Sequence, residues 1–130
     1  MADYTAKRIG DMEAVFRGSF YRARAELGVE SFGMQVIDMP PNLTQYPEHD
    51  HAESGQEEVF VMLRGGGEIE VDGERVPIDP ETIVRVGPGA RRKLWPGGEG
   101  MRVLALGGVP GQPYELLDIT KLGEPDPMAR

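Results

Sequence analysis

Short apolar runs separated by glycine, proline, asparagine and aspartate dominate the chain from Ser31 onward. Apolar runs of about four to eight residues bounded by such turn residues predict β-strands rather than helices. The expected strands cover residues 31–38, 58–64, 68–71, 74–78, 82–86, 91–95 and 102–106. A series of short strands without a long helix predicts an all-β sandwich or small barrel.

Three turn signals divide these strands. Gly65-Gly66-Gly67 is expected to end the strand over 58–64, and Pro96-Gly97-Gly98 is expected to separate 91–95 from 102–106. Asp72-Gly73 lies between two segments of alternating polar and apolar residues. That arrangement predicts a β-hairpin with a two-residue turn.

The two ends of the chain differ from this pattern. Ser19 is a candidate N-cap for a short helix over 20–27, and Gly28 is its candidate terminator. Two prolines close to the end of the chain, after Gly111, predict an extended or frayed arm. The expected organisation is an N-terminal arm with a short helix (1–30), a barrel (31–110) and a C-terminal tail (111–130).

Composition excludes several classes of function. The chain has 130 residues, with 14 Lys and Arg against 22 Asp and Glu, and a net charge of −8, which argues against duplex nucleic acid as a partner. Its longest uncharged runs are far shorter than the roughly 20 apolar residues that cross a bilayer. A charged N-terminus without an apolar stretch predicts a cytoplasmic protein. The absence of cysteine excludes disulfides, thiolate catalysis and thiolate metal sites.

The only two histidines, His49 and His51, lie two positions apart. In an extended strand such positions project from the same face, which is an arrangement that suits metal ligation. No Lys or Arg occurs between residues 48 and 58, and the acidic side chains there are Glu48, Asp50, Glu53, Glu57 and Glu58. This local charge favours a cation. The alternative is that both histidines belong to a solvated acidic loop.

Glu58 is the candidate third ligand because it begins an apolar run. We expect its carboxylate at the mouth or inner wall of the barrel, with Phe60 and Met62 continuing the same face. Two imidazoles and a carboxylate suit iron and, less selectively, manganese, nickel or zinc. Such a set leaves coordination positions open for substrate or oxygen.

The segment His49-Asp50-His51, with Glu58 and Gly65, resembles the first motif of the cupin superfamily, specifically small cupins with one conserved barrel. That motif reads His, one residue, His, a short gap, Glu, six residues and Gly, and residues 59–64 supply the last spacing. The gap between His51 and Glu58 is longer than usual. The resemblance covers about residues 31 to 109 and implies a double-stranded β-helix, or jelly-roll barrel, with a pocket inside.

The second motif of the family ends in a histidine that is normally the fourth metal ligand. Counting from the turn Gly87-Pro88-Gly89 places Arg92 at that position. One alternative is that Arg92 pairs with Glu58 in place of a metal. Another is that its planar guanidinium anchors an anionic substrate beside a metal with three protein ligands. A third alternative is that residues 91–93 form a solvated strand, and alternation favours a buried position for at least one of the three cations.

Two classes of function follow from these residues. In the first, a divalent transition metal (Fe, Mn, Ni or Zn) acts on a small polar or anionic metabolite in dioxygenase, isomerase or decarboxylase chemistry. In the second, the barrel is a metal-free binding module or a dimer scaffold. A homodimer is expected in either case. The candidate metal ligands are His49, His51 and Glu58, and the candidate substrate contacts are Arg92, Tyr46, Phe60 and Met62.

Overall fold

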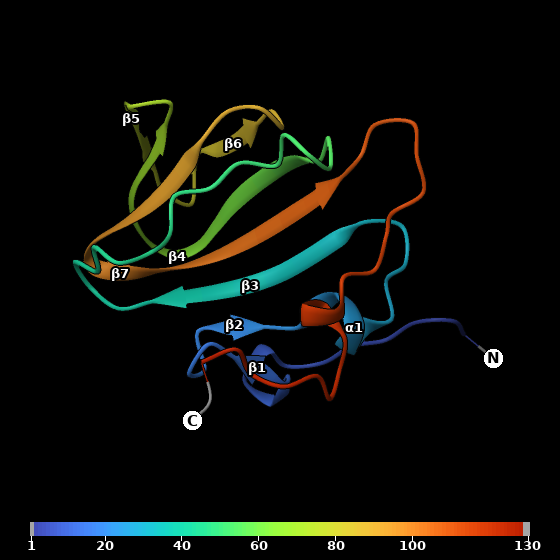
Figure 1. Ribbon diagram of the computed structural model, residues 1–130. Helices are drawn as coiled ribbons and strands as arrows, with labels where there is room; N and C mark the ends of the chain where they lie inside the picture. The colour runs from blue at the N-terminus through green and yellow to red at the C-terminus, as the bar shows by residue number, and fades with distance from the viewer. Residues whose placement is uncertain (1, 129–130) are drawn as a thin grey trace.

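In the computed structural model, which describes residues 2–128, antiparallel strands form one curled sheet (Figure 1). Along the sheet the strands run β1-β2-β3-β7-β4-β5, and β6 pairs with β4. The strands are β1 (Ala14–Val15), β2 (Phe20–Tyr21), β3 (Gly33–Met39), β4 (Glu57–Val71), β5 (Glu74–Ile78), β6 (Ile83–Val86) and β7 (Arg92–Gly108). The helical turns are η1 (Ile9–Asp11), α1 (Ala23–Leu27) and η2 (Asp118–Thr120). The all-β prediction is therefore confirmed.

Strands β4 and β7 are long, bent and paired twice along their length. One half of β4 pairs with the end of β7, and the other half, Gly67 to Val71, pairs with its beginning, Arg92 to Pro96. The predicted breaks at residues 65–67 and 96–98 are wrong, because both segments continue as strand. A Cβ atom on Gly67 would collide with the carbonyl oxygen of Trp95. Glycine at this position allows the close approach of two strands and does not end one.

Apolar side chains fill the interior of the barrel. The buried cluster consists of Ile37, Met39, Phe60, Met62, Ile69, Ile78, Val86, Leu94, Met101, Val103 and Ala105. These residues come from β3, β4, β5, β6 and β7 and occupy alternate positions, although in β4 and β7 the alternation changes parity at the bend. Burial of this apolar surface is the main force that holds the curled sheet closed.

The hairpin prediction at Asp72-Gly73 is confirmed. Val71 of β4 pairs with Glu74 of β5, and the two residues between them have φ angles of 49° and 85°. Positive φ at both central positions is the geometry of the type I′ turn, which asparagine or aspartate followed by glycine adopts most readily.

The N-terminal helix starts later than predicted. Phe20 and Tyr21 form β2, which pairs with β3, so α1 begins only at Ala23. The Ser19 hydroxyl donates to the carbonyl oxygen of Phe16 at 2.7 Å, and it therefore stabilises a turn and caps no helix. Gly28 ends α1 in the left-handed conformation, with φ of 78°, as predicted.

The C-terminal tail packs against the N-terminal segment, whereas the sequence predicts an extended or frayed arm. Arg22 is fully buried and donates from Nε to the carbonyl oxygen of Ile119 at 2.8 Å, and from Nη1 to that of Glu124 at 2.8 Å. Asp126 accepts the backbone N–H of Phe16 at 2.8 Å. Figure 1 shows the tail passing beside β1, β2 and α1, where the two ends of the chain form a layer against β3.

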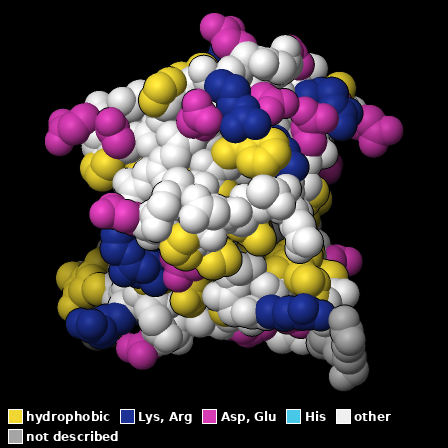
Figure 2. Space-filling view, turned by 90° about the vertical axis from the view of Figure 1, so that its left-hand side faces the viewer, with side chains coloured by type: hydrophobic (Ala, Val, Ile, Leu, Met, Phe, Trp, Pro, Cys, Tyr) yellow, Lys and Arg dark blue, Asp and Glu magenta, His cyan; other side chains and the backbone are white. Residues whose placement is uncertain are grey.

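Charged side chains of both signs cover one face of the molecule. On the face that Figure 2 presents, acidic and basic side chains are interspersed and no histidine is visible. Within residues 2–128, the helical segments lack the length and apolar character that crossing a bilayer demands.

Candidate metal-binding site

A single β-bridge and one further backbone hydrogen bond position the histidines. His49 and Arg92 form an isolated antiparallel bridge, in which the His49 N–H donates to the Arg92 carbonyl at 3.0 Å and the Arg92 N–H to the His49 carbonyl at 2.8 Å. The His51 N–H donates to the carbonyl of Pro88 at 2.8 Å. These bonds keep the segment before β4 extended, so both imidazoles project toward the same side and their ring centroids lie 5.0 Å apart.

The structure brings the three predicted ligands together. Glu58 Oε1 lies 3.4 Å from His51 Nε2 and 3.9 Å from His49 Nε2. One ligand atom from each residue lies within 4.8 Å of the others. Among the described residues, neither His51 Nε2 nor Glu58 Oε1 has a hydrogen-bond partner, although both atoms are buried. A buried polar atom without a partner costs about 1–3 kcal/mol, so a cation placed among these atoms would relieve a real penalty.

Arg92 faces the same cluster from the start of β7. Its side chain is 0% exposed, and its Nε lies 3.8 Å from Glu58 Oε1. Nη2 donates to the carbonyl oxygen of Gly87 at 2.8 Å, whereas Nε and Nη1 have no hydrogen-bond partner among residues 2–128. The neighbouring Arg91 side chain is 53% exposed, as the predicted alternation requires. Arg92 therefore brings a desolvated positive charge with free N–H groups to the edge of the ligand cluster.

Electrostatics favour a neutral imidazole at His49. Burial lowers the pKa of His49, and the positive charge of Arg92 adds to this effect, while Glu58 opposes it. Nδ1 of His49 lies 3.4 Å from the carbonyl oxygen of Pro47, which leaves Nε2 directed toward Glu58. Metal ions bind the neutral form of histidine, and a backbone partner on the second ring nitrogen fixes the ring orientation.

The other residues predicted to contact the substrate differ in how deeply they are buried. Tyr46 is partly buried, with its ring centroid 6.4 Å from that of His49. Burial and the nearby charge of Glu58 raise the pKa of Tyr46, so its hydroxyl stays protonated. Phe60 and Met62 are 1% and 3% exposed and belong to the apolar core on the same face of β4 as Glu58. They therefore lie on the core side of the cluster.

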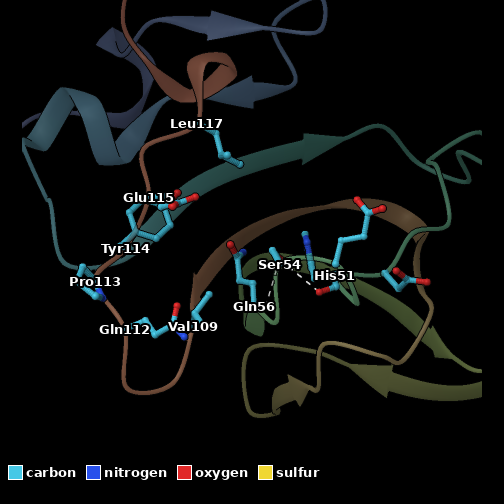
Figure 3. A pocket seen from close by; sticks show the side chains of 11 residues that line it. His51, Ser54, Gln56, Val109, Gln112, Pro113, Tyr114, Glu115 and Leu117 are labelled. Atoms are coloured by element: carbon cyan, nitrogen blue, oxygen red, sulfur yellow. Dashed lines mark hydrogen bonds between the residues drawn. The ribbon is translucent and has the colours of Figure 1, made fainter.

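A hollow of about 640 Å³ opens beside His51, between residues 50–56 and the segment 109–117 (Figure 3). Gln56 and Ser54 line one side of it, and Tyr114 and Leu117 line the other. Sequence reasoning missed this wall, because the tail was expected to extend away from the barrel. Gln56 could have been found as a polar residue inside the histidine–glutamate gap, whereas no local signal marks Tyr114.

Neither a protein-family profile nor a curated protein matches the chain. Solved structures do resemble it. A cupin protein from Bacteroides fragilis is 19% identical, with 92% of this chain and 95% of that one covered and a TM-score of 0.67. A predicted oxalate decarboxylase from Thermotoga maritima is 17% identical, with coverage of 81% and 99% and a TM-score of 0.63.

A third similar structure is a cupin 2 conserved barrel domain protein from Salinispora arenicola, 24% identical, with coverage of 59% and 62% and a TM-score of 0.51. At such identities the likeness concerns the fold, and a shared fold does not carry a shared reaction. The similar structures named as cupins agree with the curled antiparallel sheet of this chain. The chain therefore has the same jelly-roll barrel fold as these cupin structures.

Proposed function

We propose that this protein binds a divalent transition metal through His49, His51 and Glu58, and a small anionic metabolite through Arg92. The observation that carries the proposal is the convergence of three ligand atoms within 4.8 Å, two of which are buried and have no hydrogen-bond partner in residues 2–128. Two imidazoles and one carboxylate fit iron, manganese, nickel or zinc. When bound, such a metal acts as a Lewis acid that polarises an oxygen atom of the ligand.

The residues around the metal ligands have complementary roles. The planar guanidinium of Arg92 offers two buried nitrogens, Nε and Nη1, that have no hydrogen-bond partner among the described residues. A guanidinium binds a carboxylate through two such nitrogens at once. The protonated hydroxyl of Tyr46 is available as a hydrogen-bond donor. Phe60 and Met62 keep water away from the inner side of the cluster. Strong Coulomb attraction is therefore expected between Arg92 and an anionic ligand in this dry environment.

One similar structure bears the name of a predicted oxalate decarboxylase, and oxalate is a dicarboxylate. This name supports an anionic ligand for the present chain only in combination with the free N–H groups of Arg92. Dioxygenase, isomerase and decarboxylase chemistry all remain within the proposal. The predicted homodimer also stays a prediction, which sedimentation velocity would test.

A metal-free binding module is the second candidate function. It is favoured by the distance of 3.8 Å between Arg92 Nε and Glu58 Oε1, which makes these residues an ion pair in a largely buried environment. In that case Arg92 replaces the metal as the partner of Glu58. The two candidates differ in whether the cluster takes up a metal ion.

The deciding experiment measures metal binding by protein prepared without a metal-affinity tag. Elemental analysis and titration of the apoprotein with Fe²⁺, Mn²⁺, Ni²⁺ and Zn²⁺ should give about one equivalent of bound metal. His51→Ala and Glu58→Gln should lose it. Glu57→Gln is the matched control, because the Glu57 carboxylate instead pairs with Arg85 at 2.7 Å. Uptake below about a tenth of an equivalent by the wild type would refute the metal site and leave the metal-free module.

A further inference from the structure

The amide of Gln35 is buried inside the barrel without a hydrogen-bond partner. Gln35 is 8% exposed, and among residues 2–128 neither its Oε1 nor its Nε2 is hydrogen-bonded. Its position on β3 has the same parity as Ile37 and Met39, both of which belong to the barrel core, so its side chain points inward. A buried side chain that can both donate and accept is unusual without partners, and it indicates a site for a polar group.

The register of the sheet places Gln35 near the proposed metal ligands. Gln35 pairs with Ala105 of β7, and Ala105 pairs with Phe60 of β4, two residues after Glu58 on the same face. Adjacent strands lie about 4.8 Å apart, so the backbones of Gln35 and Phe60 are roughly 10 Å apart across β7. The two inward side chains, Gln35 and Glu58, therefore border the same part of the interior.

Glycines line the inner wall at the level of Glu58. Gly33 of β3 pairs with Gly107 of β7, which in turn pairs with Glu58 of β4. A Cβ atom on Gly107 would collide with the side-chain amide of Gln56, and one on Gly33 would lie 2.8 Å from the hydroxyl of Tyr114. At this level β3 and β7 carry no side chain on the inner wall, and the Gln56 amide and the Tyr114 hydroxyl lie against it.

These groups connect Gln35 to the hollow beside His51. Gln56 and Tyr114 both line that hollow, and Figure 3 shows them on opposite sides of it. A ligand that enters from the hollow passes between polar groups before it reaches the inner wall. The missing Cβ atoms make room for the Gln56 amide and the Tyr114 hydroxyl, and Gln35 is the next inward residue of β3 after Gly33.

We propose that Gln35 binds a hydroxyl or carbonyl oxygen of the ligand, so that the site selects small hydroxy acids or keto acids. This inference rests on the proposed function, which assigns the carboxylate of the ligand to Arg92. The amide of Gln35 is uncharged and can donate or accept, so it complements a neutral polar group better than a second carboxylate. A ligand with a methyl or methylene group at this point leaves both amide atoms unpaired, which is how a polar pocket rejects an analogue that lacks an oxygen.

The test compares two ligands that differ by one hydroxyl group, lactate and propionate, on the metal-loaded protein. Because a hydroxy acid also chelates metal, the informative quantity is the change in the ratio of the two dissociation constants between wild type and Gln35→Met. We expect the preference for lactate to fall about fivefold or more, with propionate binding unchanged. Gln112→Met, at an exposed glutamine that lines the hollow, is the matched control and should keep the wild-type ratio.

Two further measurements separate the possible failures. The metal content of Gln35→Met should equal that of the wild type. If neither the wild type nor the variants take up metal, the proposed function itself is refuted. In the wild type, labelled with ¹⁵N at its four glutamines, lactate should shift the side-chain amide signal of Gln35 and propionate should not. This measurement needs no variant to fold. The inference is overturned if the preference for lactate falls less than about fivefold in Gln35→Met, or if lactate does not shift the amide signal of Gln35.

Discussion

Replacing Arg92 by methionine gives the sharpest test of the site electrostatics. The substitution removes the cation whose Nε lies 3.8 Å from Glu58 Oε1, and it keeps an unbranched apolar stem in the buried space. If Arg92 faces the metal, Arg92→Met should bind metal more tightly and anions more weakly. The two changes have opposite sign, so general damage to the site cannot mimic them.

The size of the effect follows from the geometry. A metal ion lies about 2.1 Å from a carboxylate oxygen that ligates it, so the guanidinium of Arg92 would be about 5 Å from the ion. Two positive charges on the metal then repel that of Arg92 by about 7 kcal/mol at an effective dielectric constant near 20. A bound anion and rearranged solvent screen most of this repulsion. We therefore expect metal affinity to rise about 10- to 100-fold, which corresponds to about 1.4–2.8 kcal/mol.

Competition of the apoprotein with a chelating dye for Mn²⁺ or Zn²⁺ measures this affinity. Arg91→Met is the matched control, because it removes the same charge from a side chain that is 53% exposed and pairs with Glu48. It should change metal affinity less than about threefold, since exposed charges are well screened. Arg92→His should bind most tightly, because an imidazole adds a ligand. If Arg92→Met binds metal no more tightly than Arg91→Met, the reasoning is refuted.

Three predictions concern the fold. Arg22→Met should lower the free energy of unfolding by about 2–4 kcal/mol and expose the tail to limited proteolysis, because charge-assisted bonds to its carbonyls are lost; an equally resistant tail would contradict the anchor. Arg102 lowers the pKa of Asp38, so this ion pair stabilises the fold above about pH 4 and the contribution is lost as pH falls through the lowered pKa. In urea unfolding, Asp38→Asn should be less stable than wild type at pH 6, and the difference should shrink steadily as the pH is lowered. Gly67→Ala should destabilise by at least about 2 kcal/mol through collision with the facing strand, whereas Gly98→Ala, which has open space, should change stability by less than about 0.5 kcal/mol in the same assay.

Local spacing accounts for the part of the site that the sequence predicts. His49 and His51 share a face because a short bridge keeps their segment extended, and Glu58 begins the strand that carries the next inward residues. Alternation at the start of β7 likewise separates buried Arg92 from exposed Arg91, the residue just before the strand. The spacing of the histidines and the alternation along a strand involve residues within a few positions of each other, which is the range that pattern analysis covers. The bridge to Arg92 that keeps the histidine segment extended lies outside that range.

The features that the sequence did not predict depend on distant partners. Gly65-Gly66-Gly67 has the composition of a turn, yet the collision that a Cβ at Gly67 would make with Trp95 of β7 shows why glycine occurs in mid-strand. Ser19 has the character of an N-cap, but pairing of β2 with β3 draws the next two residues into the sheet. The placement of Tyr114 over Gly33 joins segments about 80 residues apart, and no local rule contains such information.

The anchoring of the tail has a consequence for how related sequences are expected to vary. Arg22 holds the carbonyl oxygens of Ile119 and Glu124, which are main-chain atoms that every amino acid possesses. Drift at positions 119 and 124 would leave these bonds intact, whereas drift at position 22 would break both. In homologues we therefore expect an invariant arginine at this position and a tail whose amino acids vary. Low sequence identity in the tail would then be compatible with an unchanged backbone path.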